Sequence, residues 1–324
     1  MKYSQIAGTG SYLPEKILSN QDLEKLVATS DEWIRERTGI ERRHIAADGE
    51  TTVDLAERAA RQAMDAAGVA AVDIDLIVFG TTTPDLVFPN CGALLQARLG
   101  IHGCAAFSVE AACSSFIFAL STADKFVRLG DAKCALVVGA ETLSRIVDWT
   151  DRNTAVLFGD GAGAAILRTA DEPGVLSTHL HTEGSYQHLL YCPVGVSAGF
   201  GVGADGRIPM HIRMSGNEIF KIAVRSLGSI VDETLAANGL EQSAIDWLIP
   251  HQANIRIIEA TARKLNMPME RVILTVHETG NTSAASVPMA LDWGIRSGQI
   301  KRGELLLLEA FGGGLTWGTA LIRY

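Results

Sequence analysis

The chain has 324 residues, of which 47% are hydrophobic, and a formal net charge of -9. Its length allows one large domain or two closely packed halves. No uninterrupted apolar run approaches the roughly 18 residues of a membrane span, and an acidic chain lacks the basic surface that nucleic acids require. We therefore expect neither a membrane protein nor a nucleic-acid-binding protein.

The N-terminal segment and the cysteines predict a cytoplasmic protein. The first ten residues contain one lysine but no apolar segment after it, so no export signal is expected. The five cysteines include no Cys-x-x-Cys pair, and we expect them to be free thiols. The spacing of His179, His181, His188 and Cys192 matches no familiar zinc ligand set, so no metal site is expected.

Two stretches of the chain share one pattern of elements, which predicts an internal duplication. A helical run over 53–67 ends at Gly68, and a buried-strand pattern begins seven residues later at Asp75. The same order recurs in the run over 224–238 and the strand that begins at Asp246. Strands that are apolar throughout are typical of sheets covered on both faces, so we expect two similar α/β halves packed together.

Two further segment pairs fit this duplication. Residues 128–139 match 296–308, and residues 163–168 match 318–323, in composition and in order. Chance similarity between apolar strands is the alternative explanation. From the duplication we predict three regions.

The predicted regions are an N-terminal half over 1–170, a connector over 171–213 and a C-terminal half over 214–324. The connector is rich in Gly, His and Ser and has no counterpart in the other half.

The first candidate for chemistry is Cys113, in the segment Ala-Ala-Cys-Ser-Ser before an apolar helical run that ends at Gly130. A thiol at a helix start faces the positive end of the helix dipole, which favours the thiolate. The alternative is a buried structural cysteine. Counting back by the same distance from Gly130 and from Gly298 leads to Cys113 and Asn281, so we predict equivalent helix starts for the two.

Three features of the second half accompany Cys113. Asn281 lies in a turn-rich helix entry, where its alternative role is an N-cap. His251 follows a predicted strand, at the end where α/β sheets usually carry their sites, and is able to donate a hydrogen bond or move a proton. The run Phe-Gly-Gly-Gly-Leu over 311–315 follows another strand, and its glycines would bring backbone N–H groups close to a ligand unless they form an ordinary hairpin.

Taken together, these segments closely resemble the 3-oxoacyl-[acyl-carrier-protein] synthase III family. The resemblance rests on Ala-Ala-Cys-Ser-Ser, His-Gln-Ala-Asn, Gly-Asn-Thr-Ser-Ala-Ala-Ser-Val-Pro and Phe-Gly-Gly-Gly-Leu-Thr-Trp-Gly. It extends along the whole chain, through Thr-Ser-Asp-Glu-Trp-Ile from Thr29 and Asp-Arg at 151–152. The family implies an α/β thiolase-like fold, with two duplicated halves in five αβαβα layers, and a homodimer.

The resemblance also implies a reaction. Cys113 would be acylated by acetyl-CoA or another short acyl-CoA, with an oxyanion hole formed by the backbone N–H groups of Cys113 and Gly313. His251 and Asn281 would stabilise the enolate formed when malonyl-acyl carrier protein loses CO2, and carbon attack on the thioester would give the 3-oxoacyl product. Elongating condensing enzymes carry a second histidine where this chain has Asn281, which favours an initiating, CoA-primed enzyme.

Further roles follow from the resemblance alone. CoA contacts would be made by Thr29, Trp33, Arg37, Arg152 and Asn254, with Trp33 and Arg152 flanking the adenine. Phe88 would reach across the dimer into the partner's acyl pocket. Acyl carrier protein would dock at Arg256, and Lys221 would extend that basic surface. No cofactor is implied, because acyl-CoA is a substrate.

Two alternatives stay open at this point. A polyketide or quinolone-forming relative would share Cys113, His251 and Asn281 but use another acyl-CoA primer. A noncatalytic acyl-CoA-binding homologue is the second, and the intact nucleophile speaks against it. The preferred primer, the pathway served and any inhibition by long acyl-CoA are not indicated by the sequence.

Overall fold

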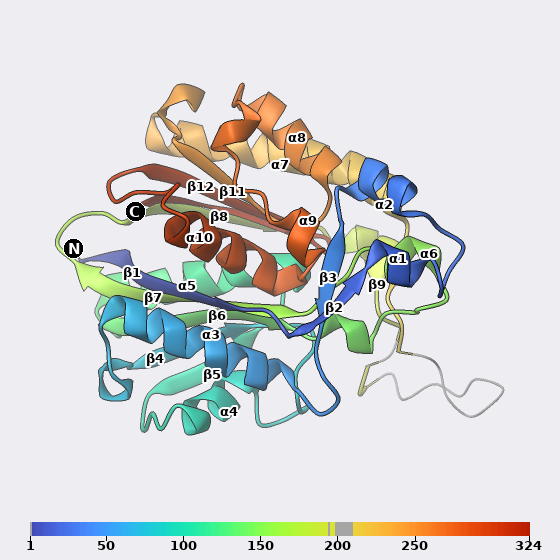
Figure 1. Cartoon of the computed structure of the whole chain (residues 1–324). Helices are drawn as coiled ribbons and strands as arrows, with labels where there is room; N and C mark the ends of the chain where they lie inside the picture. The colour runs from blue at the N-terminus through green and yellow to red at the C-terminus, as the bar shows by residue number, and fades with distance from the viewer. Residues whose placement is uncertain (1, 194, 198–209) are drawn as a thin grey trace.

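The computed structural model describes residues 2–193, 195–197 and 210–324. These residues form five stacked layers in the order helices, sheet, helices, sheet, helices (Figure 1). The α/β fold class implied by the family resemblance is therefore confirmed.

The first sheet has five strands, and its central members are apolar throughout because helices cover both of its faces. Strand β4 runs parallel to β5 and β6, whereas β7 runs antiparallel to β6 and β1. In spatial order the strands are β1 (Tyr3–Tyr12), β7 (Gly161–Ala170), β6 (Cys134–Glu141), β4 (Leu76–Gly80) and β5 (Ala105–Val109).

The second sheet repeats this plan. Its strands, in spatial order, are β11 (Trp247–Pro250), β12 (Leu305–Gly312), β13 (Thr316–Arg323) and β8 (Val175–Thr182). Strand β11 is parallel to β12, and β13 is antiparallel to β12 and β8. A single parallel bridge between Leu248 and Val272 occupies the place beside β11 that β5 occupies beside β4. The predicted duplication is thus present as a repeated order and direction of strands.

Two short antiparallel ribbons complete the strands. One pairs β2 (Lys16–Ser19) with β3 (Arg42–Ile45), and the other pairs β9 (Leu190–Tyr191) with β10 (Arg213–Met214). Strands β8 and β9 lie inside the segment predicted as a connector, and β8 belongs to the second sheet, which the sequence did not indicate. Residues 194 and 198–209 of that segment lie outside the described residues. The boundaries of the three regions stay a prediction.

The helices divide among three layers. Helices α5 and α10 lie between the sheets, α3 and α4 cover the outer face of the first sheet, and α7 and α8 cover that of the second. The bounds are α1 (Asn20–Leu23), α2 (Asp31–Thr38), α3 (Thr52–Ala67), α4 (Cys91–Arg98), α5 (Ser115–Leu129), α6 (Arg152–Ala155), α7 (Gly216–Asn238), α8 (Ile255–Lys264), α9 (Val276–Thr279) and α10 (Ser286–Arg296).

The ends of the repeated outer helices follow local chemistry. Thr51 and Asp54 form a capping box at the start of α3. Helices α3 and α7 end at Gly68 and Gly239, both with φ of 62°, a conformation that glycine adopts without strain. These are the glycines that mark the duplication in the sequence.

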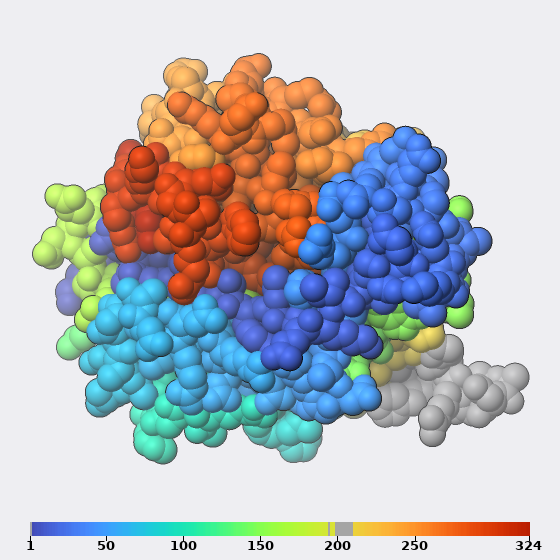
Figure 2. Space-filling view, viewed as in Figure 1, coloured from blue at the N-terminus to red at the C-terminus, as the bar shows by residue number. Residues whose placement is uncertain are grey.

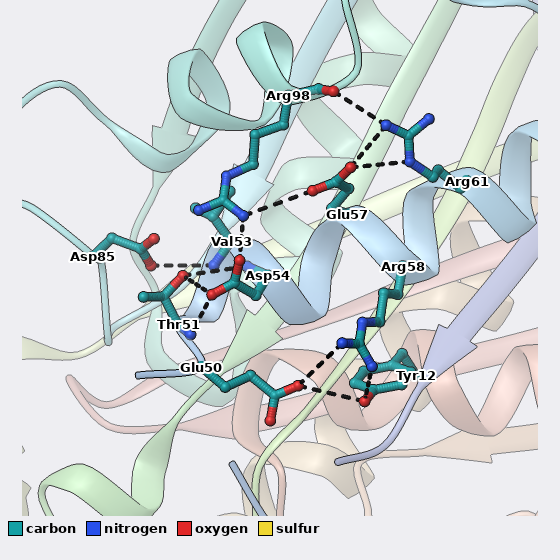
Figure 3. Close-up of polar contacts among 10 residues, drawn as sticks. All are labelled: Tyr12, Glu50, Thr51, Val53, Asp54, Glu57, Arg58, Arg61, Asp85 and Arg98. Atoms are coloured by element: carbon teal, nitrogen blue, oxygen red, sulfur yellow. Dashed lines mark hydrogen bonds and ion pairs between the residues drawn. The ribbon is translucent and has the colours of Figure 1, made fainter. Parts of the chain in front are cut away.

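A network of polar side chains connects the outer surface of α3 to α4 and to the loop after β4 (Figure 3). Arg98 of α4 forms ion pairs with Asp54 and Glu57 of α3. The carboxylate of Asp85 accepts a hydrogen bond of 3.1 Å from the backbone N–H of Val53 and so ties the loop after β4 to the start of α3.

The two halves meet over a long surface. Figure 2 shows the C-terminal segments, in orange and red, lying directly against the N-terminal segments, in blue, across the visible face. None of the described helices is long and apolar enough to cross a membrane.

Candidate active site

Cys113, His251 and Asn281 line one cavity of about 140 Å³ between the two halves. Each is 7% exposed. Cys113 lies in a 3-10 turn before α5, His251 follows β11, and Asn281 precedes the turn that opens α10. The three sequence candidates for chemistry are therefore brought together, and the rest of the lining is mostly apolar, as an acyl chain would require.

Cys113 is held in a tightly packed turn. The preceding residue, Ala112, has a φ of 46°, a left-handed conformation that is uncommon for a residue with a side chain. Thr316 secures this turn, because its hydroxyl donates to the carbonyl of Ala111 at 2.7 Å. The hydroxyl of Ser114 donates in turn to the carbonyl of Thr316 at 3.1 Å.

The glycine run lies directly against this turn. A Cβ on Gly312 would lie 2.6 Å from the backbone nitrogen of Cys113, so only glycine fits there. A Cβ on Gly313 would lie 3.5 Å from Cβ of Ala112, the residue before Cys113. The glycine run therefore does not serve only as a hairpin turn, because it belongs to the C-terminal half and contacts Cys113 of the N-terminal half.

Burial acts against ionisation of Cys113. It raises the pKa of the thiol to about 12, and hydrogen bonding by Ser283 lowers the pKa less than burial raises it. The dipole of α5 acts in the opposite direction, toward the thiolate. A thiolate at this helix start stays a prediction.

His251 is neutral because it is buried. Burial lowers the pKa of its imidazole to about 3. Its Nδ1 lies 2.9 Å from the hydroxyl of Ser286, and that hydroxyl accepts a hydrogen bond of 2.6 Å from the backbone N–H of Gln252. We infer that the Ser286 hydroxyl donates its own proton to Nδ1 of His251. The single ring proton of the neutral imidazole is then on Nε2. His251 is thereby set up as a hydrogen-bond donor.

Asn281 is fixed by its backbone and by one side-chain oxygen. Its N–H donates to the carbonyl of Leu157 at 2.9 Å, and its carbonyl accepts from Gly159 at 3.0 Å. Its Oδ1 accepts from the backbone N–H of Ser283 at 2.9 Å, so the residue does cap the turn before α10. Among the described residues its Nδ2 has no partner, which leaves a donor free for a ligand.

The predicted equivalence of Cys113 and Asn281 is wrong by three residues. Ala112 and Ser283 share a left-handed conformation, with φ of 46° and 49°, at the start of matching 3-10 turns. Cys113 is therefore matched by Ala284. The count from the glycines failed because α5 has 15 residues and is followed directly by Gly130, whereas α10 has 11 residues and is separated from Gly298 by Ser297.

One buried carboxyl close to the nucleophile, that of Glu141, was missed by sequence reasoning. Glu141 ends β6 and accepts hydrogen bonds from Thr81, Thr82 and Thr83, and also from Ser283 at 3.2 Å. Burial raises the pKa of Glu141 to about 7. An acidic residue at the end of an otherwise apolar strand was the signal in the sequence, because an unpaired carboxyl is rarely buried.

The residues predicted to bind CoA lie outside this cavity, apart from Asn254. Asn254 caps α8 through Oδ1 and donates from Nδ2 to the carbonyl of Arg37 at 2.9 Å, which joins α2 to the cavity lining. The guanidinium groups of Arg37 and Arg152 lie 4.9 Å and 4.6 Å from the centre of the Trp33 ring. An adenine between Trp33 and Arg152 would have to displace the arginine.

Thr29 lies just before α2, and its hydroxyl is buried without a hydrogen-bond partner among the described residues. Phe88 is 82% exposed and follows the exposed apolar residues Leu86 and Val87. The ring of Phe88 therefore does not line the cavity of its own chain.

The predicted docking residues lie on the rim of the cavity. The guanidinium of Arg256 lies 5.4 Å from the centre of the Phe220 ring, and Phe220 lines the cavity. Lys221 follows Phe220 on α7 and is exposed. Within the described part of the chain, neither Arg256 nor Lys221 forms an ion pair. A search of the same residues finds no cluster of three His, Cys, Asp or Glu suited to a metal ion.

Comparison with known proteins gives consistent matches. Residues 107–184 match the family model described as 3-oxoacyl-[acyl-carrier-protein (ACP)] synthase III, and residues 235–324 match its C-terminal model. A beta-ketoacyl-[acyl-carrier-protein] synthase III from Xanthomonas campestris is 66% identical over 322 residues, which cover 99% of this chain and 98% of that protein.

Solved structures agree. The 3-oxoacyl-[acyl-carrier-protein] synthase III from Aquifex aeolicus has a TM-score of 0.93 and 47% identity, covering 99% of this chain and 100% of the other. The priming beta-ketosynthase of the R1128 polyketide pathway has a TM-score of 0.95 and 34% identity, covering 99% and 96%. The two structures are almost equally similar to this chain in fold, but the synthase III from Aquifex aeolicus is more similar to it in sequence than the polyketide enzyme is.

Proposed function

The chain belongs to the 3-oxoacyl-[acyl-carrier-protein] synthase III family, and we propose that it joins a short acyl-CoA to malonyl-acyl carrier protein with loss of CO2. This is the initiating condensation of fatty acid synthesis. The observation that carries the proposal is the shared cavity, in which Cys113 meets two neutral hydrogen-bond donors, His251 and Asn281.

The first half-reaction transfers the acyl group to the enzyme. The sulfur of Cys113 attacks the carbonyl carbon of acyl-CoA, its proton leaves, and the departing CoA thiolate takes up a proton. The developing oxyanion is held by the backbone N–H groups of Cys113 and Gly313, which the glycine run brings together. The proton that the thiol gives up is balanced by the one that the CoA thiolate takes up.

The second half-reaction breaks one carbon–carbon bond and forms another. Malonyl thioester loses CO2, and the electron pair of the broken bond forms an enolate whose oxygen accepts hydrogen bonds from Nε2 of His251 and Nδ2 of Asn281. The enolate carbon then attacks the Cys113 thioester, and the thiolate that leaves takes up a proton. Neutral donors suit this step, since they stabilise the enolate without binding the malonyl carboxylate as an ion pair.

Substrate contacts outside the cavity belong to the same proposal. CoA would bind across Thr29, Trp33, Arg37, Arg152 and Asn254, with the Arg152 guanidinium moving off the Trp33 ring to admit the adenine. Arg256 and Lys221 would receive the acidic carrier protein, because they offer positive charge at the rim of the cavity.

A homodimer is also proposed. Leu86, Val87 and Phe88 form an exposed apolar run with exposed fractions of 50%, 72% and 82%, which is unusual for a surface that stays in water. Phe88 would enter the acyl pocket of the second copy. Sedimentation of the wild-type chain and of Phe88→Asp would test this, because a monomeric wild type would contradict it.

The experiment for the function follows the two half-reactions separately. Intact-protein mass spectrometry after exposure to a panel of acyl-CoAs gives the primer, which we propose is acetyl-CoA. Addition of malonyl-acyl carrier protein should then release the acyl group as 3-oxoacyl-acyl carrier protein. Loading by acetyl-CoA without turnover on malonyl-acyl carrier protein would contradict the proposal and favour a relative with another extender.

Location in the cytoplasm and independence from any cofactor stay predictions. The first is checked by fractionation of cells that produce the chain. The second is checked by activity after exhaustive dialysis against a chelator.

A further inference from the structure

Glu309 is a buried carboxyl inside the cavity with no role in the steps above. It lies on β12, and its backbone carbonyl accepts a hydrogen bond of 2.8 Å from the N–H of His251. The residue is 1% exposed and lines the cavity together with Cys113 and His251. A carboxyl is rarely placed in such surroundings without a function.

The carboxyl of Glu309 is not satisfied by its surroundings. Its Oε2 makes no hydrogen bond among the described residues, and neither does the nearby buried hydroxyl of Thr261 on α8. A buried polar atom without a partner is costly in free energy, so its retention points to a ligand that provides the partner. The cavity that Glu309 lines is where such a ligand would bind.

The surroundings of Glu309 leave it uncharged at neutral pH. Burial raises the pKa of its carboxyl to about 8, and the neighbouring Thr261 hydroxyl on α8 lowers the pKa by less. The strand neighbours of Glu309 pack in the central core, so its side chain lies on the face of β12 toward α7 and α8. The other titratable residues that line the same cavity are His251, which is neutral, and Cys113, whose thiol pKa burial raises to about 12. Leu227 of α7, Ile258 of α8 and Thr319, which is opposite Glu309 on β13, do not titrate.

The cavity also lacks a cation. Its described lining contains no Lys or Arg, so a substrate carboxylate that enters meets no ion-pair partner. A protonated carboxyl is able to donate a short O–H···O hydrogen bond to a carboxylate, and such charge-assisted bonds are about twice as strong as neutral ones. An ionised Glu309 would instead repel that carboxylate.

We propose that Glu309 recognises the carboxylate of the second substrate, by donating a hydrogen bond from its protonated side chain. This inference rests on the proposed function, in which that substrate is a malonyl thioester. It assigns Glu309 to the condensation half-reaction and not to acyl loading, because the acyl-CoA primer carries no carboxylate.

Two substitutions of Glu309 separate its possible roles. Glu309→Gln keeps an N–H donor and cannot ionise, whereas Glu309→Leu removes the donor at similar volume. Glu309→Leu should lower kcat/KM for malonyl-acyl carrier protein by about 10- to 100-fold with acetyl loading intact, as expected for one hydrogen bond to a charged group. Glu304→Gln is the matched control, since Glu304 precedes the same strand but lies outside the cavity.

The pH profile gives a readout that a structural role would not move. Condensation by the wild type should fall about tenfold per pH unit above pH 8, as Glu309 ionises. Glu309→Gln should lack this decline up to at least pH 9. This test uses only the wild type and Glu309→Gln, which is close to glutamate in size. It therefore tests the role of Glu309 even if Glu309→Leu does not fold.

Each outcome has a distinct meaning. An alkaline decline that persists in Glu309→Gln, or a Glu309→Leu variant that condenses at the wild-type rate, would overturn the inference. Equal loss of loading and condensation in folded Glu309→Leu would also overturn it. A wild-type chain that loads acetyl but never condenses with the malonyl thioester would contradict the proposed function itself.

Discussion

The hydroxyl of Ser286 lies 2.9 Å from Nδ1 of His251. The same oxygen accepts the backbone N–H of Gln252 at 2.6 Å, so its proton is directed to the imidazole. Ser286 thereby selects the tautomer of His251 that carries a proton on Nε2. Ser286, which contacts no substrate in the proposed reaction, thus determines the protonated nitrogen of His251, which does contact substrate.

Ser286→Ala should lower the rate of condensation by about 10- to 100-fold, because the neutral imidazole loses its fixed tautomer. Acyl loading should fall less, since the oxyanion of that step is held by backbone N–H groups. Ser297→Ala, at the other end of α10, is the control, because within the described structure the Ser297 hydroxyl donates only to the carbonyl of Gly294. Equal rates for Ser286→Ala and wild type would remove the positioning role.

Cys113→Ala should abolish acyl transfer, since Cys113 alone among the cysteines lines the cavity in the described structure. Peptide mapping after incubation with labelled acetyl-CoA should place the label on Cys113. Label on Cys91 or Cys134, which are also buried, would contradict the assignment.

Asn281→Ala should still form the acyl-enzyme but lose about 10²–10³ in the rate of condensation, the usual effect of removing one donor to an oxyanion. Asn281→Asp distinguishes the two uses of this side chain. It keeps the oxygen that accepts from Ser283 but loses the Nδ2 donor, so condensation should fail while the turn survives. Normal condensation in either variant would reduce Asn281 to a helix cap.

Stability should fall as the pH rises from about 5 to about 8. The pKa of Glu141 is raised to about 7 and that of Glu309 to about 8 by burial, both above the ordinary value of 4.5. The folded chain therefore holds protons that the unfolded chain has released, and it loses stability through that window. Urea unfolding at several pH values should show a smaller decline for Glu309→Gln, and an unchanged slope would count against the raised pKa.

Arg256→Ala should weaken the use of malonyl-acyl carrier protein while acetyl loading stays comparatively intact. Condensation by the wild type should also fall as salt rises, because exposed charges are screened beyond about 10 Å at 0.1 M. Arg263→Ala is the control on the same helix, since Arg263 is paired with Glu259. Equal loss of both half-reactions, or indifference to salt, would remove Arg256 as the docking residue.

The sequence was sufficient to predict those features of the fold and the site that depend only on residues close together in the chain. The apolar strands, the helix ends at Gly68 and Gly239, and the two halves were all evident from local patterns. Cys113, His251 and Asn281 were identified because short motifs surround them. These features required no knowledge of how the halves pack.

The failures all arise where distant segments meet. The match of Cys113 with Asn281 failed because the central helices differ in length, and nothing in the sequence indicated the burial that raises the pKa of the Cys113 thiol. The bond between Ser283 and Glu141 joins residues 142 positions apart, and no pattern in either segment points to the other. The role inferred for Glu309 likewise depends on a cavity that the sequence does not reveal.

The contact of Gly312 with the turn of Cys113 has a counterpart, because a Cβ on Gly139 would lie 2.1 Å from the carbonyl oxygen of Ala284. Each half thus shapes a turn of the other. During translation Cys113 leaves the ribosome long before Gly312 does, so the nascent chain carries its nucleophile without the partner that completes the oxyanion hole. The chain consequently becomes able to consume acyl-CoA only after the segment around Gly312 has been synthesised and has folded against the turn of Cys113.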